Sequence, residues 1–191
     1  IECVAGKYID GTGSVDAADC IDCGAGKYAA TIGSASVVNC IDCAAGKHST
    51  VAGSDNAASC IYCAAGKYVV ATGSTACINC GAGMHLPTVG NANSLACIEC
   101  AAGTYIDSSG SAAEDCIRCV AGRYVDTIGA ADCIDCEAGK YRDSVDNSRG
   151  CIGCPPGKYG TGTAWDDESN CINCAAGKYV DTHGRLHCVD C

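Results

Sequence analysis

The apolar and polar residues of this chain follow a block that recurs along its whole length. Each block reads approximately Ile-x-Cys-x-Ala-Gly-Lys-Tyr and continues through a variable stretch to the next cysteine. The run around Lys-Tyr is too short for a helix and is rich in residues that favour strands. A second glycine follows five residues after the aromatic position in most blocks and predicts a turn, because glycine permits positive φ. The pattern therefore predicts short β-hairpins and loops, with little or no helix.

Two apolar positions of the block keep their chemistry along the chain. The residue after each leading cysteine is Ile21, Ile41, Ile61, Ile78, Ile98, Ile117, Ile134, Ile152, Ile172 or Val189. The aromatic position holds Tyr8, Tyr28, His48, Tyr68, His85, Tyr105, Tyr124, Tyr141, Tyr159 and Tyr179. We expect the aromatic ring and the Ile side chain to cover a neighbouring disulfide, with contacts between adjacent blocks only, as in other solenoid arrays.

The cysteines define the period of the repeat. After Cys3 come ten C-x-x-C pairs, and the second cysteines of successive pairs lie 17 to 20 residues apart. Self-similarity at such a period is typical of repeat architectures. We number the predicted repeats 1 to 10; they span residues 1–20, 21–40, 41–60, 61–77, 78–97, 98–116, 117–133, 134–151, 152–171 and 172–188, and residues 189–191 begin a further repeat.

The spacing of the cysteines allows more than one arrangement. Sequential disulfides would join Cys3 to Cys20, Cys23 to Cys40, Cys43 to Cys60, Cys63 to Cys77, Cys80 to Cys97, Cys100 to Cys116, Cys119 to Cys133, Cys136 to Cys151, Cys154 to Cys171 and Cys174 to Cys188. Successive pairs could instead form four-cysteine zinc sites. We favour disulfides because every pair has equal neighbours on both sides, although spacing alone does not fix connectivity.

Composition and charge favour a cross-linked scaffold. Cysteine contributes 21 of 191 residues, Phe is absent, and the net charge is -10. A chain so acidic and so poor in large apolar side chains needs another source of stability, and this cysteine content is typical of disulfide-rich extracellular proteins. The acidic balance argues against a nucleic-acid partner, and no apolar stretch approaches the length of a membrane span.

At this point the motif resembles a known family. Units such as residues 43–47 and 174–179, followed by C-I-x-C, resemble the cysteine-rich ephrin-receptor-like repeat and the short one-disulfide module of tumour-necrosis-factor-receptor ectodomains. Similar arrays occur in surface proteins of unicellular eukaryotes. The resemblance implies an extracellular, elongated rod of ten one-disulfide units, with first-to-second disulfide pairing inside each unit.

The sequence contains no recognisable arrangement of catalytic or cofactor-binding residues. There is no cluster of nucleophile, base and orienting group, and ten C-x-x-C pairs without a βαβ context do not indicate redox catalysis. We interpret His48, His85, His183 and His187 as structural, and Trp165 as a cover for its own disulfide. The chain is therefore expected to be no enzyme, with no cofactor and no metal site.

Small hydroxyl residues recur at the predicted loop tips and suggest O-linked sugars. The candidate acceptors are Thr12, Ser14, Ser34, Thr50, Ser54, Thr72, Ser74, Ser108, Ser109 and Ser111. This expectation depends on composition and on the assumption that these hydroxyls are exposed.

The uniformity of the repeats favours a structural role. We expect a non-catalytic segment of an extracellular filament or cell-surface coat, whose partners are copies of itself or a longer continuation of the same chain. The alternative is a receptor or adhesin ectodomain, or a surface antigen, that binds a protein or glycan ligand. In the disulfide arrangement Cys191 stays unpaired, so we expect the array to continue and Cys191 to form an inter-segment disulfide.

Overall fold

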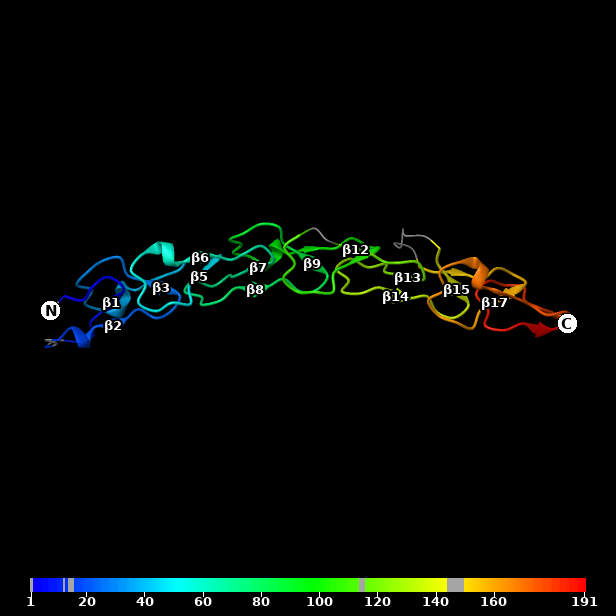
Figure 1. Cartoon of the computed structure of the whole chain (residues 1–191), viewed down its shortest axis with the longest axis horizontal. Helices are drawn as coiled ribbons and strands as arrows, with labels where there is room; N and C mark the ends of the chain where they lie inside the picture. Colours follow the sequence, from blue (N-terminus) through cyan, green and yellow to red (C-terminus); the bar gives the residue numbers. More distant parts are fainter. Residues whose placement is uncertain (1, 12, 14–15, 114–115, 144–149) are drawn as a thin grey trace. The chain divides into compact units, whose positions relative to one another are not determined.

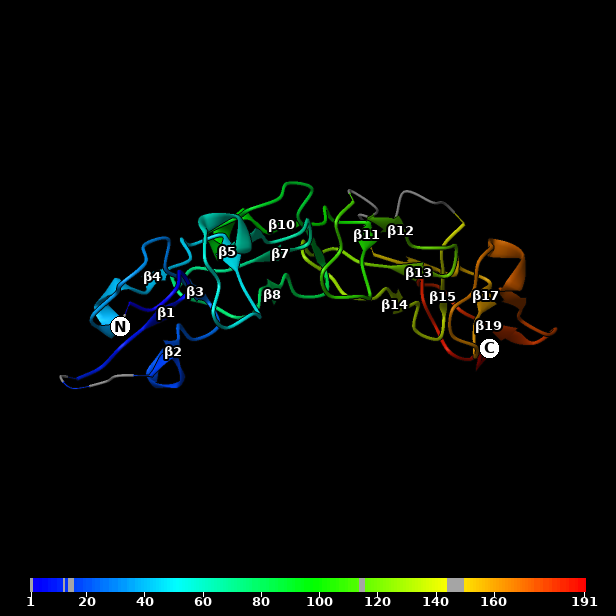
Figure 2. The ribbon, with the colours of Figure 1, turned by 60° about the vertical axis from the view of Figure 1, so that its left-hand side comes forward.

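The computed structural model of the chain describes residues 2–11, 13, 16–113, 116–143 and 150–191. Within these residues the chain forms ten antiparallel hairpins of two-residue strands and no α-helix. Short strand pairs separated by loops are visible in both ribbon views (Figure 1 and Figure 2). The predicted fold class of small, disulfide-rich hairpin units with little or no helix is confirmed.

The hairpins share one register. The strand that contains Lys-Tyr pairs with the strand after the next leading cysteine, so Tyr8 lies opposite Ile21 and Lys7 opposite Asp22. The ten pairs are β1 (Lys7–Tyr8) with β2 (Ile21–Asp22), β3 (Lys27–Tyr28) with β4 (Ile41–Asp42), β5 (Lys47–His48) with β6 (Ile61–Tyr62), β7 (Lys67–Tyr68) with β8 (Ile78–Asn79), β9 (Met84–His85) with β10 (Ile98–Glu99), β11 (Thr104–Tyr105) with β12 (Ile117–Arg118), β13 (Arg123–Tyr124) with β14 (Ile134–Asp135), β15 (Lys140–Tyr141) with β16 (Ile152–Gly153), β17 (Lys158–Tyr159) with β18 (Ile172–Asn173), and β19 (Lys178–Tyr179) with β20 (Val189–Asp190). Each hairpin therefore joins one predicted repeat to the first residues of the next.

Short 3-10 helices account for the longer loops. They are η1 (Ala17–Asp19), η2 (Val37–Asn39), η3 (Ala57–Ser59), η4 (Ser94–Ala96) and η5 (Glu168–Asn170). Each begins at a capping side chain whose oxygen accepts a backbone N–H, as Asn56 does from Ala58 at 2.9 Å. All five precede a cysteine whose disulfide has a sequence separation of 17 residues. The remaining disulfides, with separations of 14 to 16, have no such turn within the described residues.

The chain divides into two compact units. Unit 1 contains residues 1–80, 86–97 and 110–114, and unit 2 contains residues 81–85, 98–109 and 115–191. The chain crosses between the units within repeats 5 and 6.

Backbone hydrogen bonds join successive repeats in both units. In unit 1, the Gly46 N–H donates to Val69 O at 2.9 Å, and the Val69 N–H donates to Asn91 O at 3.0 Å. A third bond runs from the Gly90 N–H to Cys63 O at 2.8 Å. Unit 2 repeats this pattern, with Gly83 bonded to Ile106 and Ile106 bonded to Ala130. These bonds satisfy backbone groups that the two-residue strands leave unpaired.

The glycine before Lys-Tyr contacts a repeat two positions further along the chain. Gly83, in repeat 5, has φ +81°, and a Cβ there would collide with the carbonyl oxygen of Gly129 in repeat 7. Gly66 and Gly110 form the same contact in unit 1. The prediction that each repeat touches only adjacent repeats is therefore wrong. The reason is that the loop tip of each repeat extends past its neighbour to reach this glycine.

The core consists of small clusters around the disulfides. Tyr105 of repeat 6 packs against the Cys119–Cys133 disulfide of repeat 7, together with the buried Val125. Tyr8 packs in the same way against the disulfide of repeat 2. The aromatic ring of one repeat thus covers the disulfide of the next, as the sequence predicts.

The isoleucines after the leading cysteines are not part of this core. We call these ten positions, from Ile21 to Val189, the hairpin isoleucines; their exposed fractions range from 42% at Ile172 to 61% at Ile61. The expectation that they cover a disulfide is wrong. The residue that directly follows the aromatic position is buried instead, as Val69, Leu86, Ile106 and Val125 show, because its backbone takes part in the hydrogen bonds between repeats.

Three alanine substitutions separate backbone strain from the contact between alternate repeats. Gly83→Ala combines positive φ with the collision at Gly129 and should destabilise its surroundings by about 2–4 kcal/mol. Gly177→Ala has φ +80° but open space around a Cβ, so about 1 kcal/mol is expected. Gly81→Ala has neither feature and should have almost no effect. Native-state amide exchange would measure these values. The probes are the Ile106 and Gly129 amides for Gly83→Ala and Gly81→Ala, and the Cys191 amide, whose N–H donates to Gly177 O, for Gly177→Ala. Equal effects of all three changes would contradict the contact between alternate repeats.

Candidate functional site

All 21 cysteines lie within the described residues, and twenty of them form disulfides. The bonds are Cys3–Cys20, Cys23–Cys40, Cys43–Cys60, Cys63–Cys77, Cys80–Cys97, Cys100–Cys116, Cys119–Cys133, Cys136–Cys151, Cys154–Cys171 and Cys174–Cys188. Sulfur atoms in these bonds are not available as thiolates for four-cysteine zinc sites. Cys191 is exposed and has a free thiol; its inter-segment disulfide stays a prediction.

Four of the ten hairpins carry a cross-strand pair of opposite charges on one face. Lys7 and Asp22 approach to 3.0 Å, and Lys178 and Asp190 approach to 2.7 Å. Lys27 forms the same pair with Asp42, and its hydrogen bond is the largest cause of the lowered pKa of that carboxyl group. These charges alternate along each strand with the Tyr and Ile positions, so they lie on the opposite face of the hairpin.

Repeat 7 contains an ionic group in which one arginine bonds to two carboxylates. Arg123 donates from Nε to Asp135 at 2.7 Å, from Nη1 to Asp132 at 3.3 Å and from Nη2 to Cys133 O at 2.6 Å. The pKa of Asp132 is lowered, first by the backbone N–H of Cys133 and then by Arg123. The arrangement holds a loop against its own disulfide.

Trp165 closes the ninth disulfide, as the sequence predicts. Its ring packs against Tyr141 and the Cys154–Cys171 bond, and a Cβ on Gly160 or Gly162 would collide with the ring. The Arg142 N–H donates to Trp165 O at 2.9 Å. Burial raises the pKa of Tyr141, and the nearby carboxylate of Glu168 raises it further. Trp165 therefore has a packing role within unit 2.

The candidate O-glycosylation residues differ in exposure. Ser34 and Ser54 are only 3% and 5% exposed, and each hydroxyl donates to a carbonyl three residues earlier. The expectation of exposed hydroxyls is wrong at these two positions, because the serine after the turn glycine is packed against a neighbouring repeat. Thr50, Thr72, Ser108 and Ser109 are exposed, and Ser74 and Ser111 are half-buried. Thr12 and Ser14 lie outside the described residues.

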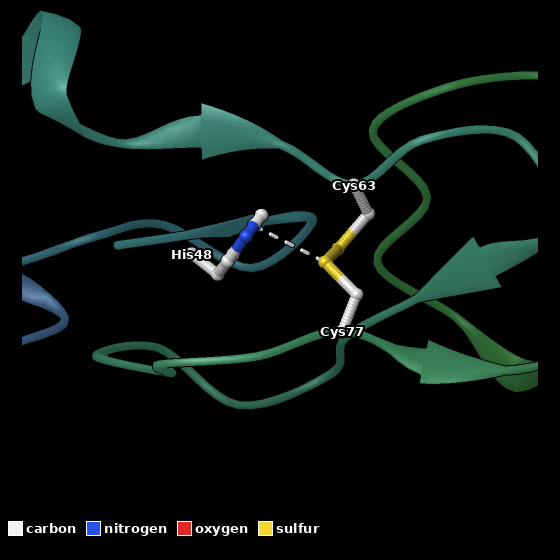
Figure 3. Close-up of side chains that lie close together, drawn as sticks. All are labelled: His48, Cys63 and Cys77. Carbon is white, nitrogen blue, oxygen red and sulfur yellow. Dashed lines mark hydrogen bonds between the residues drawn. A yellow bond between two sulfur atoms is a disulfide. The ribbon is translucent and has the colours of Figure 1, made fainter. Parts of the chain in front are cut away.

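His48 occupies the aromatic position of repeat 3 and lies beside the disulfide of repeat 4. Its Nδ1 is 3.3 Å from Cys77 Sγ, and the imidazole edge points at the Cys63–Cys77 bond (Figure 3). The ring nitrogen and the two sulfur atoms all lie within 4.8 Å of one another. This is the kind of trio that could bind a metal ion if both cysteines were reduced. As a disulfide, the sulfur atoms are much poorer ligands.

The other histidine at an aromatic position has a different environment. His85 is buried, and within the described residues its Nδ1 has no hydrogen-bond partner. His183 and His187 are exposed. The structure therefore brings only His48 to a sulfur atom among the histidines singled out in the sequence.

Sequence reasoning missed the buried position after the aromatic residue. It holds Ala29, Val69, Leu86, Ile106 and Val125, among others. Most repeats have an apolar residue at this position, but repeat 3 has Ser49 and repeat 8 has Arg142 there. These two polar residues made the position look variable, so its burial was not predicted from the sequence. Arg142 is buried there with Nη1 donating to Gly150 O at 2.7 Å.

Comparison with known proteins supports the resemblance of the repeats. Residues 50–94 and 122–164 match the sequence model of the tyrosine-protein kinase ephrin type A/B receptor-like family. The predicted similarity to the ephrin-receptor-like repeat is confirmed over these two segments, and this repeat is a non-catalytic type of module. No curated protein matches the chain. Among the described residues, no helix is long and apolar enough to cross a membrane.

The match and the disulfides indicate the compartment. Disulfides persist in oxidising environments and are rare in the cytosol. Ten disulfides together with an ephrin-receptor-like repeat suggest an extracellular ectodomain.

The Asp132 carboxyl group should report directly on its two contacts. Because its pKa is lowered in the folded chain, its stabilising contribution is present above the ordinary pKa and is lost as pH falls through the folded value. Arg123→Gln should raise the pKa only part of the way, since the Cys133 N–H remains. Carbon-detected NMR titration below about pH 5 would measure this. Lys140→Gln is the control, because Lys140 pairs with Glu137 instead; an equal shift in both variants would contradict a contact effect.

Proposed function

We propose that this chain is a non-catalytic structural segment of an extracellular filament or cell-surface coat protein. The observation that carries this proposal is the repeated set of backbone hydrogen bonds and glycine contacts, which joins most of the described repeats to the next two in both units. Such contacts depend little on side-chain identity. They support an array in which one repeat performs the same mechanical task as another.

The disulfides give each repeat a short covalent path. Tension along the chain passes through the disulfide and the C-x-x-C segment and bypasses the loop of 14 to 17 residues. The disulfide spans 5.5 to 5.8 Å between α-carbons, and C-x-x-C adds roughly 10 Å when extended. A fully stretched repeat therefore reaches roughly 16 Å, against about 60 Å for the same residues with the disulfide reduced.

Single-molecule extension tests this mechanical interpretation. The oxidised protein should stop extending at roughly 16 Å per repeat, and each disulfide that is reduced should release about 40–55 Å more. The Cys119→Ser/Cys133→Ser double variant is the matched control, because it should show one such release without reductant. Extension of the oxidised protein far beyond the limit would rule out sequential disulfides as the path that carries the tension.

Copies of the same chain are the proposed lateral partners. The hairpin isoleucines keep one chemistry at one position of every repeat and remain exposed. Exposed apolar side chains in such numbers are typical of surfaces that associate, and a second copy offers apolar groups at the same interval. A longer continuation of the array and O-linked glycans at Thr50, Thr72, Ser108 and Ser109 are also proposed.

Electron microscopy of the native protein tests assembly. We expect filaments or sheets, and we expect Ile134→Lys combined with Ile117→Lys to reduce association at least tenfold, equivalent to about 1.4 kcal/mol. Ile128→Lys is the matched control, because Ile128 is also exposed but lies outside the hairpins. Compact monomers at all concentrations, or equal loss of assembly in the control, would refute the proposal.

A receptor or adhesin ectodomain, or a surface antigen, is the second candidate. The match to a receptor-like family supports it, as does the exposed Tyr62 in repeat 4, whose ring lies 4.2 Å from the Lys47 ammonium group. A ligand surface would be confined to one or two repeats. Loss of cell or glycan binding in Tyr62→Ser, with assembly unchanged, would favour this candidate over the first.

A further inference from the structure

The disulfide of repeat 4 has chemical surroundings that a matched disulfide in unit 2 lacks. In repeat 7 the Cys119–Cys133 bond is covered by Tyr105, whereas the Cys63–Cys77 bond has the imidazole of His48 beside it (Figure 3). Both bonds have a sequence separation of 14 residues. Imidazole can accept and donate protons near neutral pH, which a phenol ring does not. The two repeats therefore differ in the group that faces the sulfur, and repeat 7 also has Arg123 bonded to Cys133 O.

The two sulfur atoms of this disulfide also differ in access. Cys63 is fully buried, whereas Cys77 is half-buried. An open cavity of about 360 Å³ is lined by His48 and Cys77, and also by Thr50, Tyr62, Lys67 and Thr75. Cys63 does not line it. A small molecule in this cavity would meet Cys77 Sγ and the imidazole together.

The cavity also contains a cation without a carboxylate partner. Lys67 lies opposite Asn79 in its hairpin, where Lys7 and Lys27 lie opposite aspartates. Within the part of the chain that the structure describes, Lys67 has no carboxylate at ion-pair distance. Its ammonium group is therefore available to a small anion in the cavity.

We propose that the Cys63–Cys77 disulfide is a thiol-exchange site for small thiols that carry an anionic group. Lys67 binds the anionic group, and the thiol approaches Cys77 Sγ from the cavity, beside the imidazole of His48. The Nδ1–H of His48 donates to Cys77 Sγ, because a disulfide sulfur has no proton and can only accept. The proposal is independent of a mechanical or a receptor role of the chain.

The exchange step balances without an oxidant or reductant other than the thiol. The incoming thiol gives its proton to water, and its thiolate attacks Cys77 Sγ, which the hydrogen bond from His48 Nδ1–H makes more electrophilic. The new bond joins the incoming sulfur to Cys77, the Cys63–Cys77 bond breaks, and its electron pair leaves on Cys63. The Cys63 thiolate takes the Nδ1 proton of His48, which lies within 4.8 Å, and His48 regains a proton from water. The products are a mixed disulfide at Cys77 and a buried thiol at Cys63.

Incubation of the intact, oxidised protein with mercaptoacetate, followed by acid quench, alkylation and peptide mapping, tests the proposal. The expected result is a mercaptoacetate adduct on Cys77 with alkylated Cys63, formed about 100-fold faster than any adduct on Cys119 or Cys133. His48→Tyr places at this position the residue found in most other repeats, so it should fold, and it should slow exchange to the rate of the control disulfide. Lys67→Gln should abolish the preference for mercaptoacetate over the cationic thiol cysteamine.

Three outcomes would overturn the inference. They are similar exchange rates at both disulfides, adducts on Cys63 instead of Cys77, and an unchanged rate in His48→Tyr. A preference for mercaptoacetate that survives Lys67→Gln would overturn the assignment of the anion site. Intact masses of the eight other disulfides after the reaction verify that the exchange is local and that the variants are folded.

Discussion

The carbonyl of a loop tip lies directly against the α-carbon of a glycine two repeats earlier, and this approach leaves no room for a side chain. Gly66 and Gly110 in unit 1, and Gly83 and Gly129 in unit 2, show the contact. Because the two backbones are so close, the N–H groups of the intervening repeat reach their acceptors, and the aromatic ring comes to lie over the next disulfide. A side chain at this glycine would push the two backbones apart and so disrupt the hydrogen bonds and the packing on the disulfide together.

Much of the local structure follows from the sequence, whereas the contacts between repeats do not. Strand-forming residues around Lys-Tyr and the turn glycines predict hairpins, and the same cysteine pairs that spacing favours are joined in the structure. The hairpin isoleucines show the limit of this reasoning. Burial of Ile61 depends on where the neighbouring repeats lie, and backbone hydrogen bonds between repeats set their positions. The order of apolar and polar residues in the sequence does not reveal those hydrogen bonds. The same is true of Ser34 and Ser54, which composition alone places on the surface.

The surroundings of His48 illustrate a second limit. In the sequence His48 only replaces a tyrosine, and its sulfur partner is 29 residues away. One signal was available, because Asn79 replaces the aspartate that pairs with lysine in other hairpins. Without the structure, nothing connected this substitution to His48. His48 and Lys67, the lysine that lies opposite Asn79, thus line one cavity.

The bonds between repeats involve main-chain atoms, and this has an evolutionary consequence. A duplicated or deleted repeat brings the same donors and acceptors to its new neighbours, provided that its glycine and cysteines are kept. Unequal recombination within the gene can therefore change the number of repeats without a need for compensating mutations. Exposed residues of the 3-10 helices such as Val38 and Leu95 are free to diverge between copies, so the outer surface of the array can change while the scaffold beneath stays constant.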